Sequence, residues 1–111
     1  MVKRVLSLLV LLIMVAFPAV AQITQTGTLN GIVHDQEKQP LPGVTVSISS
    51  PALILPSMET VTNERGHWRF PALPPGTYTV TFKLPGFKTL VREGIQVNVG
   101  VNTTLDVTLE Q

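Results

Sequence analysis

The chain has 111 residues, no cysteine, and eight Lys or Arg against seven Asp or Glu. Without cysteine it can form neither a disulfide nor a cysteine-ligated zinc site, and it has no thiol nucleophile, so the fold must be held by burial alone. Residues 22–111 carry six basic and seven acidic side chains. They leave no basic stripe to follow a phosphate backbone, so nucleic-acid binding is not expected.

Residues 1–21 have the pattern of a secretory signal peptide. Met1–Arg4 carry two positive charges, Val5–Phe17 are continuously apolar, and Ala19–Ala21 supply the small residues of a cleavage site. The alternative, a retained membrane anchor, needs roughly 20 apolar residues, more than this segment has. We therefore predict cleavage after Ala21 and membrane contact only before it. The exported chain would then be periplasmic, associated with the outer membrane, or secreted.

A short polar segment at residues 22–26 precedes a series of short segments in which apolar and polar residues alternate. Such alternation is typical of half-buried β-strands. It predicts strands near 29–33, 44–49, 59–63, 67–70, 77–84, 88–92, 95–99 and 105–109. Turn residues separate most of them, at 64–66, 74–76, 85–86, 93–94 and 100–102. Residues 50–58 (SPALILPSM) are apolar, but Pro51 and Pro56 interrupt them, so this segment is predicted to be a loop.

No window shows sustained helical periodicity with caps. Seven or eight short strands at regular spacing predict an all-β, antiparallel Greek-key sandwich over residues 27–111. The inward-facing positions give one predicted core: Leu29, Val33, Val44, Val46, Ile48, Trp68, Phe70, Tyr78, Val80, Phe82, Ile95, Val97, Val99, Leu105, Val107 and Leu109.

Five motifs in order resemble those of the carboxypeptidase regulatory-like domain, a transthyretin-like sandwich. They are GIVHD at 31–35, PLPGVTV at 40–46, TNERGHWRF at 62–70, LPPGTYTV at 73–80 and the Phe87 that follows Pro85-Gly86. The resemblance covers residues 27–111. It implies a transthyretin-like fold and an accessory role, because in metallocarboxypeptidases this module lies beside the catalytic domain and carries no zinc ligands.

In many exported bacterial proteins the same kind of module precedes the plug and barrel of a TonB-dependent outer-membrane receptor. The SPALILP loop and the segment from Phe87 to Ile95 are similar to modules at the start of such receptors. The sequence ends at Gln111, where a plug would begin. A small stand-alone protein and a truncated receptor both remain open.

Catalysis is not expected. His34 and His67 fall on outward strand positions, and no third ligand at motif spacing accompanies them, so neither a metal nor another cofactor is predicted. Asp35 and Glu37 are better explained by a solvated polar turn than by a cation site. The C-terminal motif of the transthyretin-like hydrolase, Tyr-Arg-Gly-Ser, is absent, so that activity does not carry over.

The best candidates for a binding site are the large apolar residues of the 50–58 loop. A loop that carries Leu53, Ile54, Leu55 and Met58 either covers the core or binds a partner. An exposed edge strand is a second route to a protein partner. Phe87 is the candidate aromatic platform for a glycan, or else it plugs one end of the core. The sequence thus favours an exported, non-enzymatic interaction module that binds a protein, with a carbohydrate-binding module as the alternative.

Overall fold

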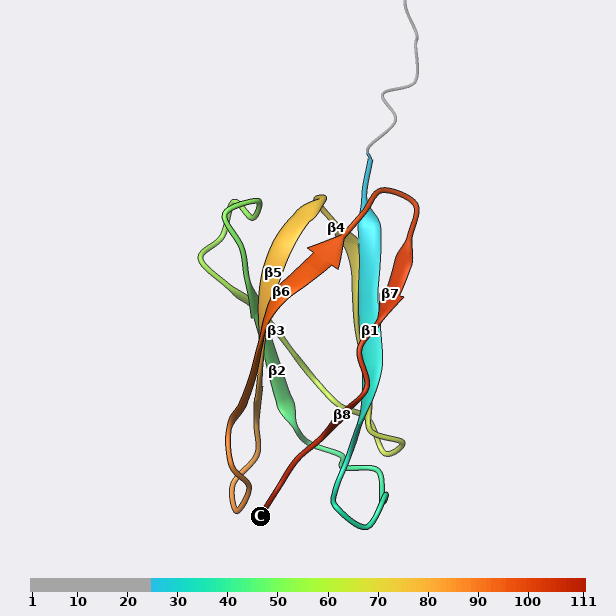
Figure 1. Ribbon diagram of the computed structural model, residues 1–111, viewed down its shortest axis with the longest axis vertical. Helices are drawn as coiled ribbons and strands as arrows, with labels where there is room; N and C mark the ends of the chain where they lie inside the picture. Colours follow the sequence, from blue (N-terminus) through green and yellow to red (C-terminus); the bar gives the residue numbers. More distant parts are fainter. Residues whose placement is uncertain (1–24) are drawn as a thin grey trace, which may run out of the picture.

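The computed structural model describes residues 25–111, which form two β-sheets packed face to face (Figure 1). The predicted signal peptide, residues 1–21, lies outside the described residues. The strands are β1 (Gly27–His34), β2 (Thr45–Ser49), β3 (Met58–Val61), β4 (His67–Leu73), β5 (Gly76–Lys83), β6 (Leu90–Val97), β7 (Asn102–Thr104) and β8 (Val107–Thr108). Among residues 25–111, no helix has the length and apolar character needed to cross a membrane.

The two sheets confirm the predicted sandwich. One sheet has the strand order β4-β1-β7, with β8 also pairing with β1, and the other has the order β3-β2-β5-β6. The pairs β1–β4, β2–β3, β2–β5 and β5–β6 are antiparallel. β1 differs on its other edge, because it pairs in parallel with β7 and then with β8. The first strand of the domain is therefore held between β4 and the last strands.

Most predicted inward positions are buried. Ile95 and Leu105 are only partly buried but pack against the core. Val99 is wrong as a core residue, since it is 46% exposed. β6 ends at Val97, and the chain then turns through Gly100 at φ 71°, so strand alternation no longer applies at Val99.

Leu73 is a core residue that the alternation missed. Its side chain is buried although it lies three positions after the buried Phe70. Pro71 and Ala72 between them are exposed, Ala72 has φ 57°, and the β1–β4 register shifts here. This bulge changes which residues of β4 face inward, so the period of two breaks within the strand.

The predicted turn at Glu93-Gly94 is also wrong, because both residues lie within one continuous strand, β6. Ile95 pairs with Tyr78 and Arg92 with Val80, so Glu93 and Gly94 together oppose a single residue of β5. Gly94 has the positive φ of 71° that this bulge needs. Because β5 continues without a break, β6 pairs with it again at Ile95, although the local sequence alone indicated a turn.

Two polar residues, Thr62 and Asn63, fix the connection from β3 to β4. The buried Thr62 hydroxyl accepts a hydrogen bond from the Val44 N–H at 2.9 Å and donates one to the Leu41 carbonyl at 2.7 Å. The Asn63 side-chain oxygen accepts from the N–H groups of Arg65 and His67. These bonds give the Thr-Asn pair of the 62–70 motif a structural role.

Gly31 lets the chain after β7 approach β1 closely. A Cβ at this position would lie 1.8 Å from the Leu105 carbonyl oxygen and 3.0 Å from Trp68 Nε1. No side chain fits there without a backbone shift. The glycine of the 31–35 motif therefore leaves the space that the chain between β7 and β8 needs to run beside β1.

Candidate functional site

The β2–β3 loop, the β4–β5 turn and the β6–β7 turn lie at the end of the sandwich where β1 begins (Figure 1). The β2–β3 loop is tied to β5 by the Ser50 hydroxyl, which donates to the Thr77 carbonyl at 2.6 Å. The β6–β7 turn is tied to the start of β1, because the Gly100 N–H donates to the Thr26 carbonyl at 3.0 Å. We call residues 25–28, 50–57, 74–77 and 97–102 the uncharged end.

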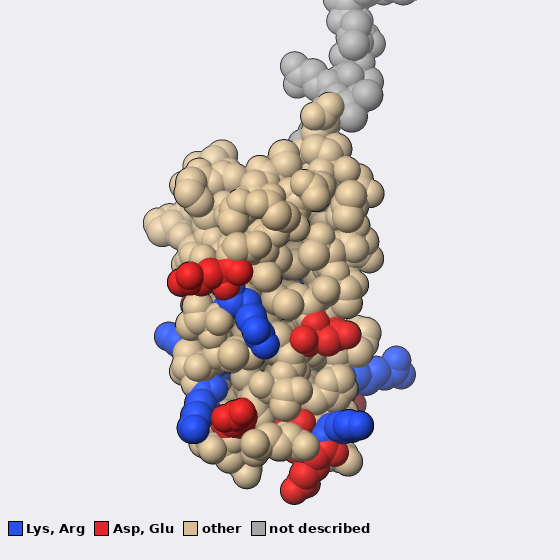
Figure 2. All heavy atoms as spheres, viewed as in Figure 1, with Lys and Arg blue, Asp and Glu red and all other residues tan. Residues whose placement is uncertain are grey.

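These four segments contain no Asp, Glu, Lys, Arg or His. In Figure 2 the face in view carries its red and blue side chains over the middle and the opposite end, and the uncharged end is tan throughout. A surface without charge can be covered by a partner without the desolvation cost that a buried charge imposes. The asymmetry makes this end the best candidate binding surface of the described residues.

The predicted loop residues divide into two pairs. Leu53 and Met58 are half-buried and pack against the core. Ile54 is fully exposed, at 102% of its reference area, and Leu55 is 60% exposed. The first pair thus anchors the loop, and the second pair forms an apolar tip.

Sequence reasoning missed two other exposed apolar side chains of this end, Val99 and Val101. They flank Gly100 in the β6–β7 turn, although strand alternation predicts Val99 to be in the core. The glycine was the available signal, because residues on either side of a tight turn are commonly exposed.

Phe87 does not join the loop residues. It lies in the turn between β5 and β6, at the end of the sandwich opposite the uncharged end (Figure 1). Its N–H donates to the Leu84 carbonyl at 3.0 Å, and its half-buried ring packs against the core. The five predicted partner-binding residues therefore fall at two separate ends of the domain.

The Asp35 side chain stabilises a turn, and His34 and His67 lie on different strands. Within residues 25–111, no group of three or more His, Asp or Glu could hold a metal ion. Asp35 uses one carboxylate oxygen to accept the N–H groups of Glu37 and Gln39, at 2.8 and 2.9 Å, so it stabilises its own turn. His67 is exposed on β4, and His34 is half-buried at the end of β1.

Tyr78 is the titratable group that burial perturbs. Loss of water around its ring raises the pKa of the phenol above its ordinary value. Its hydroxyl donates to the Pro74 carbonyl at 2.7 Å, across the β4–β5 turn. The neutral phenol thus has a hydrogen-bond partner in the adjacent turn.

The sequence model of the carboxypeptidase regulatory-like domain matches residues 28–110. The chain belongs to this family. A curated relative, the TonB-dependent transporter Oar of Myxococcus xanthus, is 38% identical over 91 residues. That match covers 81% of this chain but 8% of Oar, so the family domain corresponds to a small part of the transporter.

Two solved structures show the same fold. The Bacillus anthracis TIE protein has a TM-score of 0.68 at 22% identity, over 78% of this chain and 17% of its own. A streptococcal ancillary pilin has a TM-score of 0.63 at 22% identity, over 80% of this chain and 33% of its own. At these identities the likeness concerns the sandwich alone.

Proposed function

We propose that this carboxypeptidase regulatory-like domain is an exported, non-enzymatic accessory module of the cell envelope that binds a protein partner through its uncharged end. The observation that carries the proposal is the uncovered apolar tip of the β2–β3 loop, Ile54 and Leu55. Burying a large aliphatic side chain stabilises a complex by about 1.5–3 kcal/mol. Val99 and Val101 are further exposed apolar side chains at the same end.

The anchoring of the loop supports this role. Leu53 and Met58 hold the loop on the core, and the Ser50 hydroxyl fixes its first residue to β5. A loop held at both ends loses less conformational freedom on binding than a free one. The tip is therefore presented to a partner at a low entropic cost.

Placement in the envelope has two supports. The pattern of residues 1–21 predicts export, and the relative Oar is a TonB-dependent transporter. Transport is not part of the proposal, because the similarity spans 8% of Oar.

The 38% identity to Oar favours a second candidate, the leading module of a TonB-dependent receptor. The coding DNA beyond Gln111 separates the two. A frameshifted plug and barrel there would favour the receptor, and a stop followed by an unrelated gene would favour a small protein.

The test places a photo-crosslinking amino acid at position 54 and, as the control, at position 91. Val91 is also exposed, at 49%, but lies on β6 away from the uncharged end. We expect one envelope protein to be cross-linked from position 54 and not from position 91. Replacing both Ile54 and Leu55 by Ser should abolish capture by an affinity-tagged domain while thermal unfolding stays unchanged, whereas Val91→Ser should leave capture intact.

Two results would contradict the proposal. In the first, the double serine variant unfolds at a lower temperature yet still captures its partner, which would mean that the tip stabilises the fold. In the second, positions 54 and 91 cross-link the same set of proteins, which would indicate contacts without a defined surface.

A further inference from the structure

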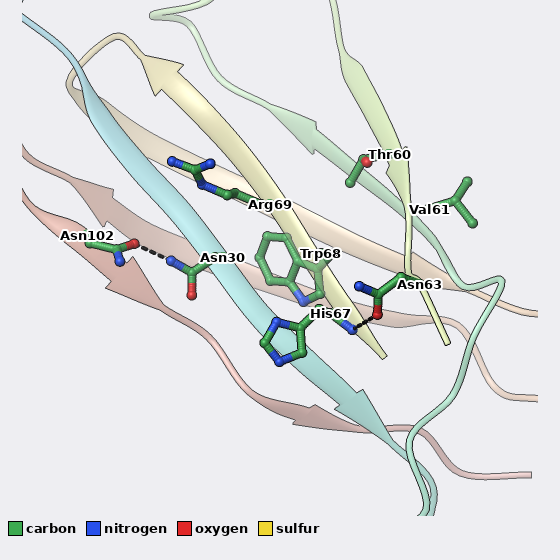
Figure 3. Close-up of a pocket in the computed structure, with 8 residues that line it drawn as sticks. All are labelled: Asn30, Thr60, Val61, Asn63, His67, Trp68, Arg69 and Asn102. Atoms are coloured by element: carbon green, nitrogen blue, oxygen red, sulfur yellow. Dashed lines mark hydrogen bonds between the residues drawn. The ribbon is translucent and has the colours of Figure 1, made fainter. Parts of the chain in front are cut away.

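A groove of about 590 Å³ lies on the outer side of the β4-β1-β7 sheet and reaches over to the edge of β3. Figure 3 shows Arg69 and His67 projecting from β4, Asn30 from β1 and Asn102 from β7. Neighbouring strands of a sheet lie about 4.8 Å apart, so these side chains span about 10 Å across three strands. The groove is open, and Asn102 is the one lining residue that it shares with the uncharged end.

The amides along the groove are held in place. The Asn30 side-chain N–H₂ donates to the Asn102 side-chain oxygen, and the Thr104 hydroxyl donates to the Asn30 side-chain oxygen at 3.3 Å. Each amide oxygen uses one of its two acceptor positions, and the N–H₂ of Asn102 can still donate. Two hydrogen-bonding groups are thus oriented before any ligand arrives.

The charge of the groove has one sign. None of its lining residues is an acid, and Arg69 forms no ion pair within residues 25–111. Asp106, on the β8 side of β1, is engaged by the Ile32 N–H at 3.0 Å. An unpaired guanidinium beside oriented amides favours a ligand that carries both a carboxylate and hydroxyl groups, because Arg binds carboxylates with two parallel hydrogen bonds.

We propose that this groove binds an acidic glycan, with Arg69 on a sugar carboxylate and the Asn30–Asn102 pair on neighbouring hydroxyls. Sugar hydroxyls both donate and accept, as amides do, which suits the mixed polar lining. Phe87, the aromatic residue that the sequence offered for glycan binding, does not line the groove.

An acidic peptide fits the site less well. An extended peptide gains most of its affinity by adding a strand to a free edge. The edge of β4 is interrupted by Pro71, which lacks an N–H, and by the bulge at Ala72. β3, the facing edge, has only four residues. The two edges therefore offer short or broken ladders to a peptide.

The experiment uses the purified protein with three probes: polygalacturonate, a neutral polysaccharide, and poly-glutamate. Trp68 borders the groove and is the single tryptophan of the chain, so a change in its fluorescence is the readout for binding. We expect binding to polygalacturonate alone. Arg69→Gln should weaken it about tenfold or more, the usual effect of losing a hydrogen bond to a charged group. Arg92→Gln, an exposed cation on β6 of the other sheet, is the matched control and should leave binding unchanged.

Each opposite result would overturn the proposal. Equal losses in Arg69→Gln and Arg92→Gln would indicate unspecific attraction to a polyanion. If poly-glutamate binds as tightly as polygalacturonate, the occupant is an acidic peptide. If the neutral polysaccharide binds as tightly, Arg69 does not recognise a carboxylate. Asn102→Ala removes an amide without changing the charge. If this variant binds polygalacturonate as tightly as the parent protein, the amide pair has no part in binding.

Discussion

The hydroxyl of Thr62 is the polar group whose removal should cost this fold most clearly. Thr62 is 4% exposed, and its hydroxyl bonds both the Val44 N–H and the Leu41 carbonyl, which lie in the connection between β1 and β2. Thr62→Val keeps the shape and removes both hydrogen bonds. The N–H of the buried Val44 then loses the Thr62 hydroxyl as its hydrogen-bond acceptor.

The expected loss follows from these contacts. An unsatisfied buried donor or acceptor costs about 1–3 kcal/mol, and Leu41 is only half-buried, so its carbonyl can partly regain water. The free energy of unfolding should fall by about 2–4 kcal/mol in Thr62→Val. A domain of this size has roughly 5–15 kcal/mol of stability, so the variant should still fold.

Thr62→Ser is the control, because it keeps the hydroxyl and deletes one methyl group, at a cost of about 1 kcal/mol. Urea unfolding followed by Trp68 fluorescence measures both variants. The reasoning is refuted if Thr62→Val lies within about 0.5 kcal/mol of the parent protein, or if Thr62→Ser loses as much as Thr62→Val.

Two glycines and one tyrosine give further predictions. Gly31→Ala places a methyl group 1.8 Å from the Leu105 carbonyl oxygen, so urea unfolding should show a loss of about 3 kcal/mol. Gly94→Ala meets open space and should lose only about 1–2 kcal/mol, through its positive φ; an equal loss in both variants would contradict the contact argument. Burial raises the pKa of Tyr78, so the folded state holds the phenol proton more tightly than the unfolded state does. The stability that the folded state gains from this difference is complete below about pH 10 and is lost as the pH rises further. The alkaline fall in melting temperature should therefore be shallower in Tyr78→Phe, and an unchanged slope would show that burial of Tyr78 does not set it.

Alternation of polar and apolar residues predicted most of the core because the strands are half-buried and nearly regular. It failed where the backbone leaves the regular strand. Leu73 follows the Pro71-Ala72 bulge, and Val99 follows the end of β6. Glu93-Gly94 has the composition of a turn, and only the continuous partner β5 makes it a bulge. At both bulges the deciding contact lies on the neighbouring strand.

Only part of the proposed binding surface could be predicted from the sequence. The apolar composition of the 50–58 loop predicted a special role, but which side chains fold back depends on the packing beneath the loop. Leu53 and Met58 reach the core, and Ile54 and Leu55 do not. The groove proposed to bind a glycan could not be predicted at all, because Asn30 and Asn102 are 72 positions apart and meet only through the parallel pairing of β1 with β7.

That parallel pairing also bears on when the domain can fold. β1 is the first strand, and its second edge is covered only by β7 and β8, so the sheet cannot close until nearly the whole chain is free to move. Contacts between segments so distant require closure of a long loop and are associated with folding in milliseconds to seconds. A chain that emerges from an export channel amino terminus first would thus stay open until its last strands are released, and it would acquire the groove and its final shape together.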